Sequence, residues 1–163
     1  MTKYPLEQLA IIKKKKLEEA EKILRQKKEK LLEEEEKLKK VEAERDKAKK
    51  HQQEKLEQFR NALDEGEKTT KLEQMRLYMK IVEEKLKEHE KKVAAQVKQV
   101  EKADKEVEEA RQDMIKRQRD VEKLKEHKGE WKKEVRKEEE AEEGKESDEI
   151  GGTRFIRKKK GRL

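Results

Sequence analysis

The sequence predicts an all-α fold, a long antiparallel two-helix coiled-coil hairpin followed by a disordered C-terminal tail. Apolar residues return at alternating gaps of three and four from Leu72 to Val135, over roughly nine heptads. A weaker series with the same spacing precedes them, and a turn signal separates the two. Because hydrophobic residues make up 29% of the chain and charged residues 55%, a thick globular core is excluded.

The second predicted helix covers about residues 71–137 and carries the stronger pattern. Its inward positions form two rows, which we call a and d, and together they make one thin apolar seam. The a row contains one charged residue, whereas small and polar residues interrupt the d row. The a row is Leu72, Met79, Leu86, Val93, Val100, Val107, Met114, Val121, Lys128 and Val135, and the d row is Met75, Val82, His89, Gln96, Ala103, Ala110, Arg117, Leu124 and Trp131.

The first predicted helix covers about residues 5–63, with Pro5 in its first turn, where a missing N–H costs nothing. Its apolar stripe also contains charged residues and is expected to slip by four residues after Gln52, a stutter that continues the stripe at Leu56, Phe59 and Leu63. Before the slip the stripe is Leu6, Ala10, Leu17, Ala20, Leu24, Leu31, Leu38, Val41 and Ala48, with Lys13, Lys27, Glu34 and Arg45 on the same face.

A turn is predicted at about residues 64–70, where both patterns stop. Gly66 can adopt the left-handed conformation that ends a helix. Thr70 and Glu73 have the spacing of a capping box that opens the next helix. A stop, a start and a register break therefore coincide.

Folding the chain at this turn pairs inward residues whose numbers sum to about 134 or 135. Several pairs then match one large side chain with one alanine, as for Leu24 with Ala110 and Leu31 with Ala103, which keeps the layers even in volume. A parallel homodimer would place Ala103 against itself. We therefore expect a monomeric hairpin over residues 1–137, although Lys27 would face a valine and weaken its layer.

The last segment, residues 138–163, has no heptad pattern. It is acidic up to Glu149 and basic from Arg154 onward, a composition that is typical of a disordered tail. The basic end, together with the lysines at 13–16, leaves nucleic-acid binding open as an alternative. Because stacking aromatics are not interleaved with these lysines, solvated surfaces are the favoured interpretation.

No catalytic, phosphate-binding or metal-binding motif occurs in the sequence, so we expect a protein that is not an enzyme and needs no cofactor or metal. The three histidines are not spaced as ligand pairs. The chain contains no cysteine and no apolar run of membrane-spanning length. We therefore expect a cytoplasmic protein without membrane insertion.

Six residues are candidates for contact with a partner protein: Lys13, Lys14, Lys15, Lys16, Tyr78 and Trp131. The lysines form a run of positive charge, which could equally be a solvated helix face. Trp131 stands at a d position near the open end, where it caps the seam or anchors a partner, since tryptophan is enriched at interface hot spots. Tyr78 flanks the turn and is adjacent to an inward position.

Several short motifs, in this order and spacing, closely resemble the chlamydial YscO-like members of the type III secretion family that includes flagellar FliJ. The resemblance covers about residues 4–151. The motifs are Tyr4-Pro5-Leu6-Glu7, Ile12-Lys13-Lys14, Glu44-Arg45-Asp46-Lys47, Leu63-Asp64-Glu65-Gly66, and His127-Lys128 with Glu130-Trp131.

The resemblance implies a non-enzymatic central stalk that contacts the hexameric secretion ATPase, and further implies contact with an export-gate protein and secretion chaperones. It places the protein in the bacterial cytoplasm, peripheral to the secretion apparatus at the inner membrane. The open end, near 6–17 and 114–135, would enter the ATPase ring, and the turn would point to the export gate. A generic coiled-coil scaffold or homodimer remains the first alternative, and nucleic-acid binding through the tail remains the second.

Overall fold

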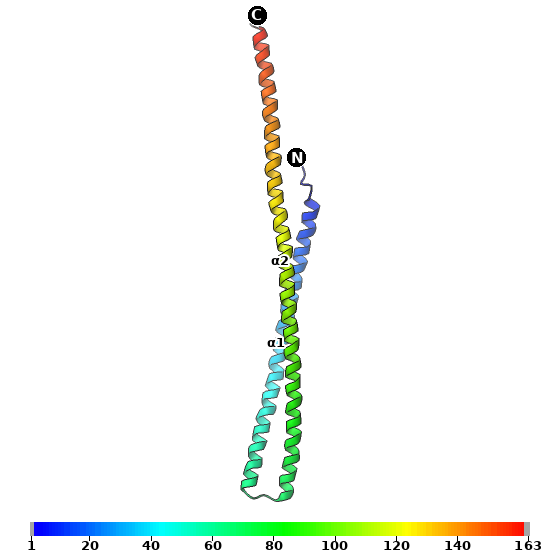
Figure 1. The fold of residues 1–163 in the computed structure, drawn as a ribbon, viewed down its shortest axis with the longest axis vertical. Coiled ribbons are helices and arrows are strands. Elements are labelled where there is room, and N and C mark those ends of the chain that lie inside the picture. Colours follow the sequence, from blue (N-terminus) through cyan, green and yellow to red (C-terminus); the bar gives the residue numbers. More distant parts are fainter. Residues whose placement is uncertain (1, 162–163) are drawn as a thin grey trace. The chain divides into compact units, whose positions relative to one another are not determined.

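The computed structural model describes residues 2–161, and these residues form two long helices joined by a short turn (Figure 1). Helix α1 spans Glu7–Asp64 and helix α2 spans Thr69–Gly161. No β-strand occurs within residues 2–161. The arrangement is consistent with a helical hairpin, and the last two residues of the predicted tail lie outside the described residues.

The chain divides into two compact units, each of which contains a segment of both helices. Unit 1 comprises Met1–Ala20 and Met114–Leu163, and unit 2 comprises Glu21–Asp113. In unit 1, Lys13 contacts Asp120 and Glu7 contacts Lys128; in unit 2, Lys27 contacts Glu106 and His51 contacts Tyr78. Within each unit, therefore, the residue number in α2 falls as the number in α1 rises.

The seam predicted for α2 is confirmed at every position. Each a and d residue from Leu72 to Val135 is buried or half-buried, whereas most residues between them are exposed. The most buried are Ala103, at 3% exposure, and Val82, at 4%. Among residues 2–161 no large side chain is completely enclosed, as expected where only one helix covers each inward residue.

In α1 the predicted seam is confirmed up to Ala48, but the predicted stutter is wrong. The heptad spacing continues without a slip, and Gln52, Lys55, Phe59 and Ala62 occupy the next inward positions. Leu56 and Leu63, which were expected inside, are 36% and 46% exposed. The reason is geometric. An uninterrupted helix keeps its period, so these two leucines fall beside the inward face although they are large and apolar.

The turn contains the expected left-handed glycine and is shorter than predicted. Gly66 has φ of 71°, its N–H donates to the carbonyl of Leu63, and the N–H of Glu67 donates to the carbonyl of Ala62. These two bonds form a Schellman motif. The predicted capping box is wrong, because α2 already begins at Thr69; the carbonyl of Lys68 accepts the N–H groups of Lys71 and Leu72 instead.

The entry to α1 is also a turn. The N–H of Glu7 donates to the carbonyl of Tyr4 at 3.2 Å, and Pro5 occupies the first corner of this turn, where its fixed φ is favourable. The helix therefore begins two residues after Pro5, the predicted start. The consequence is that Tyr4 is held at a fixed position before the helix.

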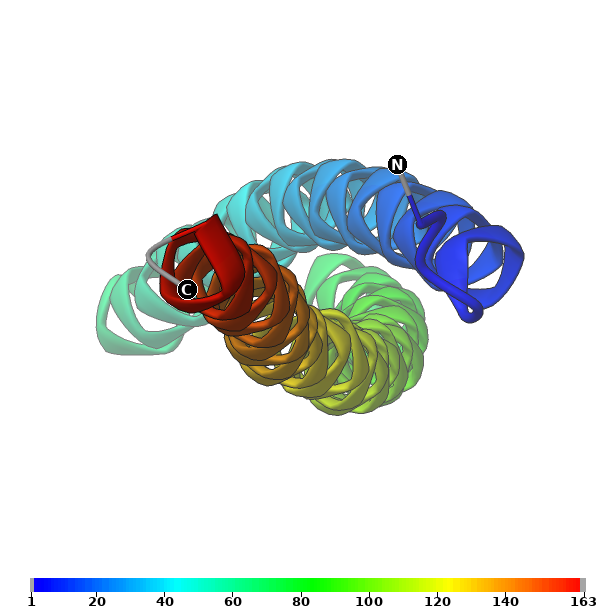
Figure 2. The same cartoon turned by 90° about the horizontal axis from the view of Figure 1, so that it is seen from above.

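At its C-terminal end α2 differs from the predicted disordered tail, because it is helical through to Gly161. This end is red in Figures 1 and 2, and Figure 1 shows that it extends past the N-terminal end of α1. Residues 136–161 are all exposed. Helices without tertiary packing depend on local propensity alone. We therefore expect this segment to be the least protected part of α2. No helix among residues 2–161 is long and apolar enough to cross a membrane.

Two glycines provide a test of the backbone description. Gly66 has a positive φ, so Gly66→Ala should destabilise the protein by about 1 kcal/mol. Gly129 is helical and a Cβ added there would meet nothing within 4 Å, so Gly129→Ala should stabilise by about 0.5–1 kcal/mol. Urea unfolding measures both effects, and shifts of the same sign in the two variants would contradict the assignment.

Candidate functional site

Two lysines in the seam of α1, Lys13 and Lys27, are paired with acidic residues of α2 that stand one position before a valine of the seam. In unit 2 the Lys27 ammonium lies 3.2 Å from the Glu106 carboxylate. In unit 1 the Lys13 ammonium lies 3.5 Å from the Asp120 carboxylate. The two pairs are separated by 14 residues on each helix, which is two heptads. The same arrangement, an inward lysine paired with an acidic residue beside the seam, therefore occurs twice.

The pairing lowers the pKa of the Glu106 carboxyl below its ordinary value. The hydrogen bond from Lys27 is the largest cause, followed by the positive charges of Lys27 and Lys30. These cations favour the ionised carboxylate. Lys27 was predicted to weaken its layer, and Glu106 gives its ammonium a partner at the edge of the seam.

Glu34 is the acidic residue of the seam in unit 2, and its hydrogen-bond partner is a side-chain amide. The side chain of Gln96 donates one hydrogen bond to the Glu34 carboxylate at 2.6 Å and another to the Glu34 carbonyl at 2.9 Å. The pKa of Glu34 is lowered, first by this amide and then by the nearby Lys37 and Lys30 charges. The polar d residue Gln96 is therefore the partner of a polar residue on α1.

An aromatic cluster fixes the N-terminal entry in unit 1. Tyr4 is only 6% exposed, and its ring centroid lies 5.2 Å from that of Trp131 and 5.7 Å from that of His127. The Tyr4 hydroxyl and the His127 Nδ1 atom are hydrogen-bonded. Lys128 lies over the Tyr4 ring and its ammonium is 2.9 Å from the Glu7 carboxylate. We call these residues the N-terminal clasp.

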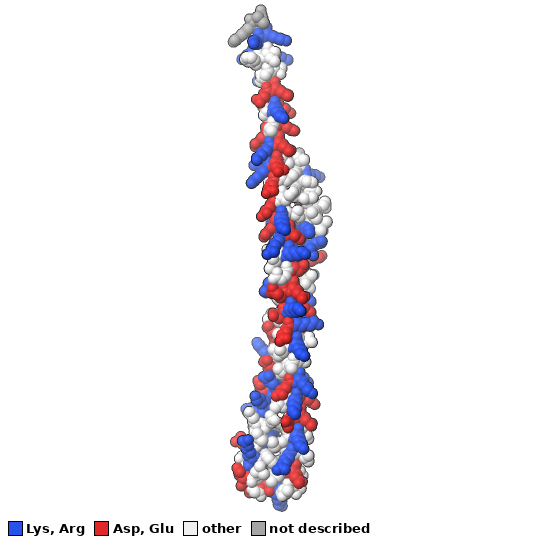
Figure 3. Space-filling model, in the orientation of Figure 1, with Lys and Arg blue, Asp and Glu red and all other residues white. Residues whose placement is uncertain are grey.

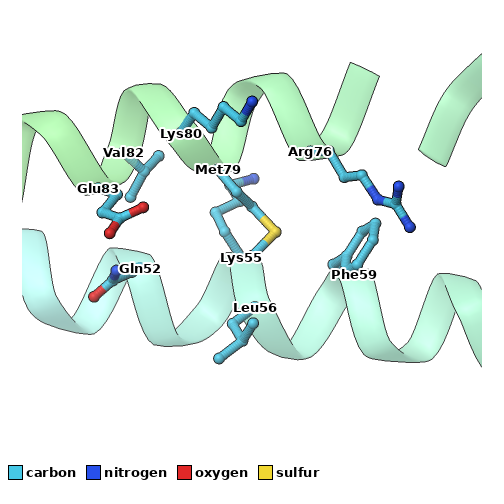
Figure 4. Close-up of a pocket in the computed structure, with 9 residues that line it drawn as sticks. All are labelled: Gln52, Lys55, Leu56, Phe59, Arg76, Met79, Lys80, Val82 and Glu83. Atoms are coloured by element: carbon cyan, nitrogen blue, oxygen red, sulfur yellow. The ribbon is translucent and has the colours of Figure 1, made fainter. Parts of the chain in front are cut away.

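In unit 2, near the turn, the two helices border an open groove of about 280 Å³. Figure 4 shows Phe59 from α1 and Arg76 from α2 pointing toward one another, with Met79 extending from α2 toward α1. The Arg76 guanidinium lies 5.9 Å from the centre of the Phe59 ring, within cation–π range. The complete lining is Gln52, Lys55, Leu56, Phe59, Arg76, Met79, Lys80, Val82 and Glu83.

Exposed apolar side chains also lie on α2 in the same part of unit 2, outside the lining of this groove. Leu77 and Ile81 are 61% and 48% exposed on α2. Tyr78 is 44% exposed; its hydroxyl is 3.1 Å from the His51 Nε2 atom, and the Lys55 ammonium lies 5.4 Å from its ring centre. Tyr78 lines a different groove, together with Met75. Apolar residues gathered at a surface typically mark a contact site.

The structure separates the six predicted contact residues by environment. Lys13 is half-buried and paired with Asp120, whereas Lys14, Lys15 and Lys16 are exposed on α1. Trp131 is half-buried against Tyr4. Tyr78 belongs to unit 2, and none of its contacts given above involves the other five.

Sequence reasoning missed Tyr4 and His127 as members of the N-terminal clasp. Tyr4 precedes the helix and has no place in the heptad, and His127 is adjacent to an inward position. The only signal in the sequence is the Tyr-Pro pair, because proline restricts the residue before it to extended conformations. Within residues 2–161 no group of three His, Asp or Glu side chains is arranged to hold a metal ion.

The grooves are open and lined by long side chains from two helices, a geometry suited to protein contacts and unlike the concave pockets of small-molecule sites. The fold and these surfaces are those of an all-α protein built from two long helices. A comparison with protein-family models matches residues 1–161 to the family described as YscO-like protein, so the chain belongs to the YscO-like family.

A solved structure supports the same family. It is described as a candidate YscO homologue, CT670 from Chlamydia trachomatis, and it superposes with a TM-score of 0.87 at 43% sequence identity. The match covers 93% of this chain and 93% of that one. A search of curated proteins found no match.

The Lys27–Glu106 pair predicts a dependence of stability on acid. Because the folded-state pKa of Glu106 lies below its ordinary value of 4.5, the pair stabilises fully above that value and its contribution is lost as the pH falls through the folded-state pKa. Between about pH 5 and pH 3, the urea midpoint of the parent should fall further than that of Glu106→Gln. The exposed Glu109 provides the control: Glu109→Gln should follow the parent, and an equally steep fall in Glu106→Gln would contradict the pairing.

The N-terminal clasp predicts a fluorescence change. Trp131 is the single tryptophan of the chain, so its emission reports on the clasp alone. Tyr4→Ala should uncover Trp131, shift its emission to longer wavelength and cost about 1–2 kcal/mol of stability. Tyr78→Ala, which changes the other tyrosine, should leave the emission unchanged; an unshifted spectrum in Tyr4→Ala would contradict the clasp.

Proposed function

We propose that the chain is the non-enzymatic central-stalk component of a type III secretion system and contacts the hexameric secretion ATPase. The observation that carries the proposal is the family match over residues 1–161, because the YscO-like family resembles stalk proteins of secretion ATPases. The open contact surfaces and the absence of an enclosed cleft among the pockets described above support a binding role.

The proposed fold of the stalk is a monomeric antiparallel coiled coil. The support is the uninterrupted spacing of three and four along both helices, together with the opposed numbering of the contacts within each unit. A cross-link between cysteines placed at Leu24 and Ala110 tests it, since the parent has no cysteine. Closure within one chain at monomer mass supports the hairpin, whereas closure between chains supports the alternative homodimer or scaffold.

The exposed lysines of unit 1 are the proposed ATPase contact, with Trp131 nearby in the same unit. Lys14, Lys15 and Lys16 have no role in the seam, so their charge is available to an acidic surface of the ring. Tyr78 and the groove near the turn are the proposed contact for an export-gate protein or a secretion chaperone. The proposed location is the bacterial cytoplasm, beside the secretion apparatus at the inner membrane.

The test is capture of the secretion ATPase by this protein, followed by an ATPase assay with and without it. We expect binding and stimulation by the parent, and a loss of about tenfold or more in affinity for Lys14→Glu/Lys15→Glu/Lys16→Glu, because charge complementarity is reversed. The matched control reverses three exposed lysines of unit 2, Lys39, Lys40 and Lys49. Equal stimulation by the parent and the first variant would reject these lysines as the contact, and no binding by the parent would reject the stalk function.

A further inference from the structure

The end of α2 reverses its charge over a few residues. Residues 138–149 contain eight acidic side chains and one lysine, whereas residues 150–161 contain five cations and no acid. Figure 3 shows acidic side chains below the basic end of this helix. Two adjacent glycines, Gly151 and Gly152, mark the reversal. The charge pattern therefore defines residues 150–161 as a separate segment, which we call the terminal segment.

The terminal segment also exposes large apolar side chains. Phe155 is 67% exposed, Ile150 is 57% exposed and Ile156 is 56% exposed. They have no role in the seam, because every residue from 136 to 161 is exposed. Three large apolar residues among five cations are unusual for a tail that only increases solubility, since such a tail needs charge alone.

Helical geometry places Phe155 and Ile156 on a different side of the helix from three of the five cations. Phe155 and Ile156 lie about 100° apart around the helix, on the side that also carries the two glycines. Lys159 lies between them, and its aliphatic stem can lie along an apolar surface while its ammonium stays in water. Arg157 and Lys158 stand three and four residues after Arg154, and these three cations lie on the other side together with Ile150. The segment is therefore a short basic amphipathic helix.

We propose that the terminal segment binds the surface of an anionic lipid bilayer. Clusters of lysine and arginine are attracted to anionic headgroups, and apolar side chains beside them insert at the boundary between headgroups and acyl chains. Both requirements are met within twelve residues. A nucleic acid would use the cations but not the isoleucines, since base stacking needs an aromatic or guanidinium face.

The acidic stretch before the glycines limits the contact to the terminal segment. An anionic surface repels the acidic residues 138–149. This repulsion decays over a distance of about 8 Å at physiological ionic strength. Gly151 and Gly152 weaken the helix between the two charge blocks. The terminal segment can therefore turn onto the bilayer while the acidic block stays in water.

Flotation of the full-length protein with vesicles tests the proposal. The probes are vesicles of phosphatidylcholine alone and vesicles containing about 30% phosphatidylglycerol, whose charge attracts basic segments. We expect binding to the anionic vesicles only, and about 10- to 100-fold weaker binding for Lys158→Ala/Lys159→Ala/Lys160→Ala. The matched control, Lys39→Ala/Lys40→Ala/Lys49→Ala, removes the same charge from exposed positions of α1 and should bind like the parent.

A second pair of variants tests the apolar component. Phe155→Ala/Ile156→Ala keeps all five cations, so its residual binding should be weaker and more sensitive to salt than that of the parent. Phe155→Trp should keep parental binding and show emission at shorter wavelength on anionic vesicles, over the constant signal of Trp131. No such shift would show that Phe155 stays in water and would overturn the apolar part of the proposal.

Two outcomes would overturn the proposal as a whole. One is equal flotation of the parent and the Lys158→Ala/Lys159→Ala/Lys160→Ala variant. The other is no flotation with salt-dependent, tail-dependent binding to a single-stranded oligonucleotide, which would assign the segment to nucleic acid. Neither outcome affects the stalk proposal, because the ATPase assay contains no lipid and its variants lie in α1.

Discussion

A single apolar seam is the constraint on which the rest of the structure depends. With two helices, each inward side chain is covered from one direction and borders water on both sides, so among residues 2–161 no large side chain is completely enclosed. Small residues then do much of the packing, because they let the helix backbones approach closely: Ala20, Ala62 and Ala103 are all less than 8% exposed. The small residues that interrupt the inward rows are therefore positions where the two helices pack closely.

The same constraint explains how the seam accepts charge. A lysine such as Lys27 cannot be buried completely in so thin a structure, so its stem lies across the seam and its ammonium reaches the edge, where Glu106 stands. At Glu34 the inward residue is acidic, and the side-chain amide of Gln96 donates a hydrogen bond to its carboxylate. Partly exposed pairs of this kind contribute modestly to stability, but they oppose a shift of one helix along the other, since a slip would separate every pair at once.

Periodicity predicted most of the fold. The seam of α2 was predictable at every position because side chains on one helix face recur with a fixed period. The error in α1 arose where Leu56 and Leu63 lie beside the seam: hydrophobicity favoured them, whereas the helix period required Lys55 and Ala62. Tyr4 could not be found by periodicity, because a turn and not a helix positions it. The acidic partners of Lys13 and Lys27, which are Asp120 and Glu106, lie one position off the seam, and a pattern based on apolar residues does not identify them.

The candidate contact surfaces contain apolar side chains that do not take part in the seam. In a chain with so few apolar residues, the seam accounts for most of them, and the exposed ones on outer faces do not contribute to its packing. Leu77 and Ile81 stand one turn apart on α2, outside the seam and outside the lining of the groove that contains Phe59 and Arg76. Exposing such side chains to water gives the folded monomer no benefit. A partner that covers them would gain their burial without disturbing the pairs that fix the register, so the outer faces can change with the partner while the seam stays constant.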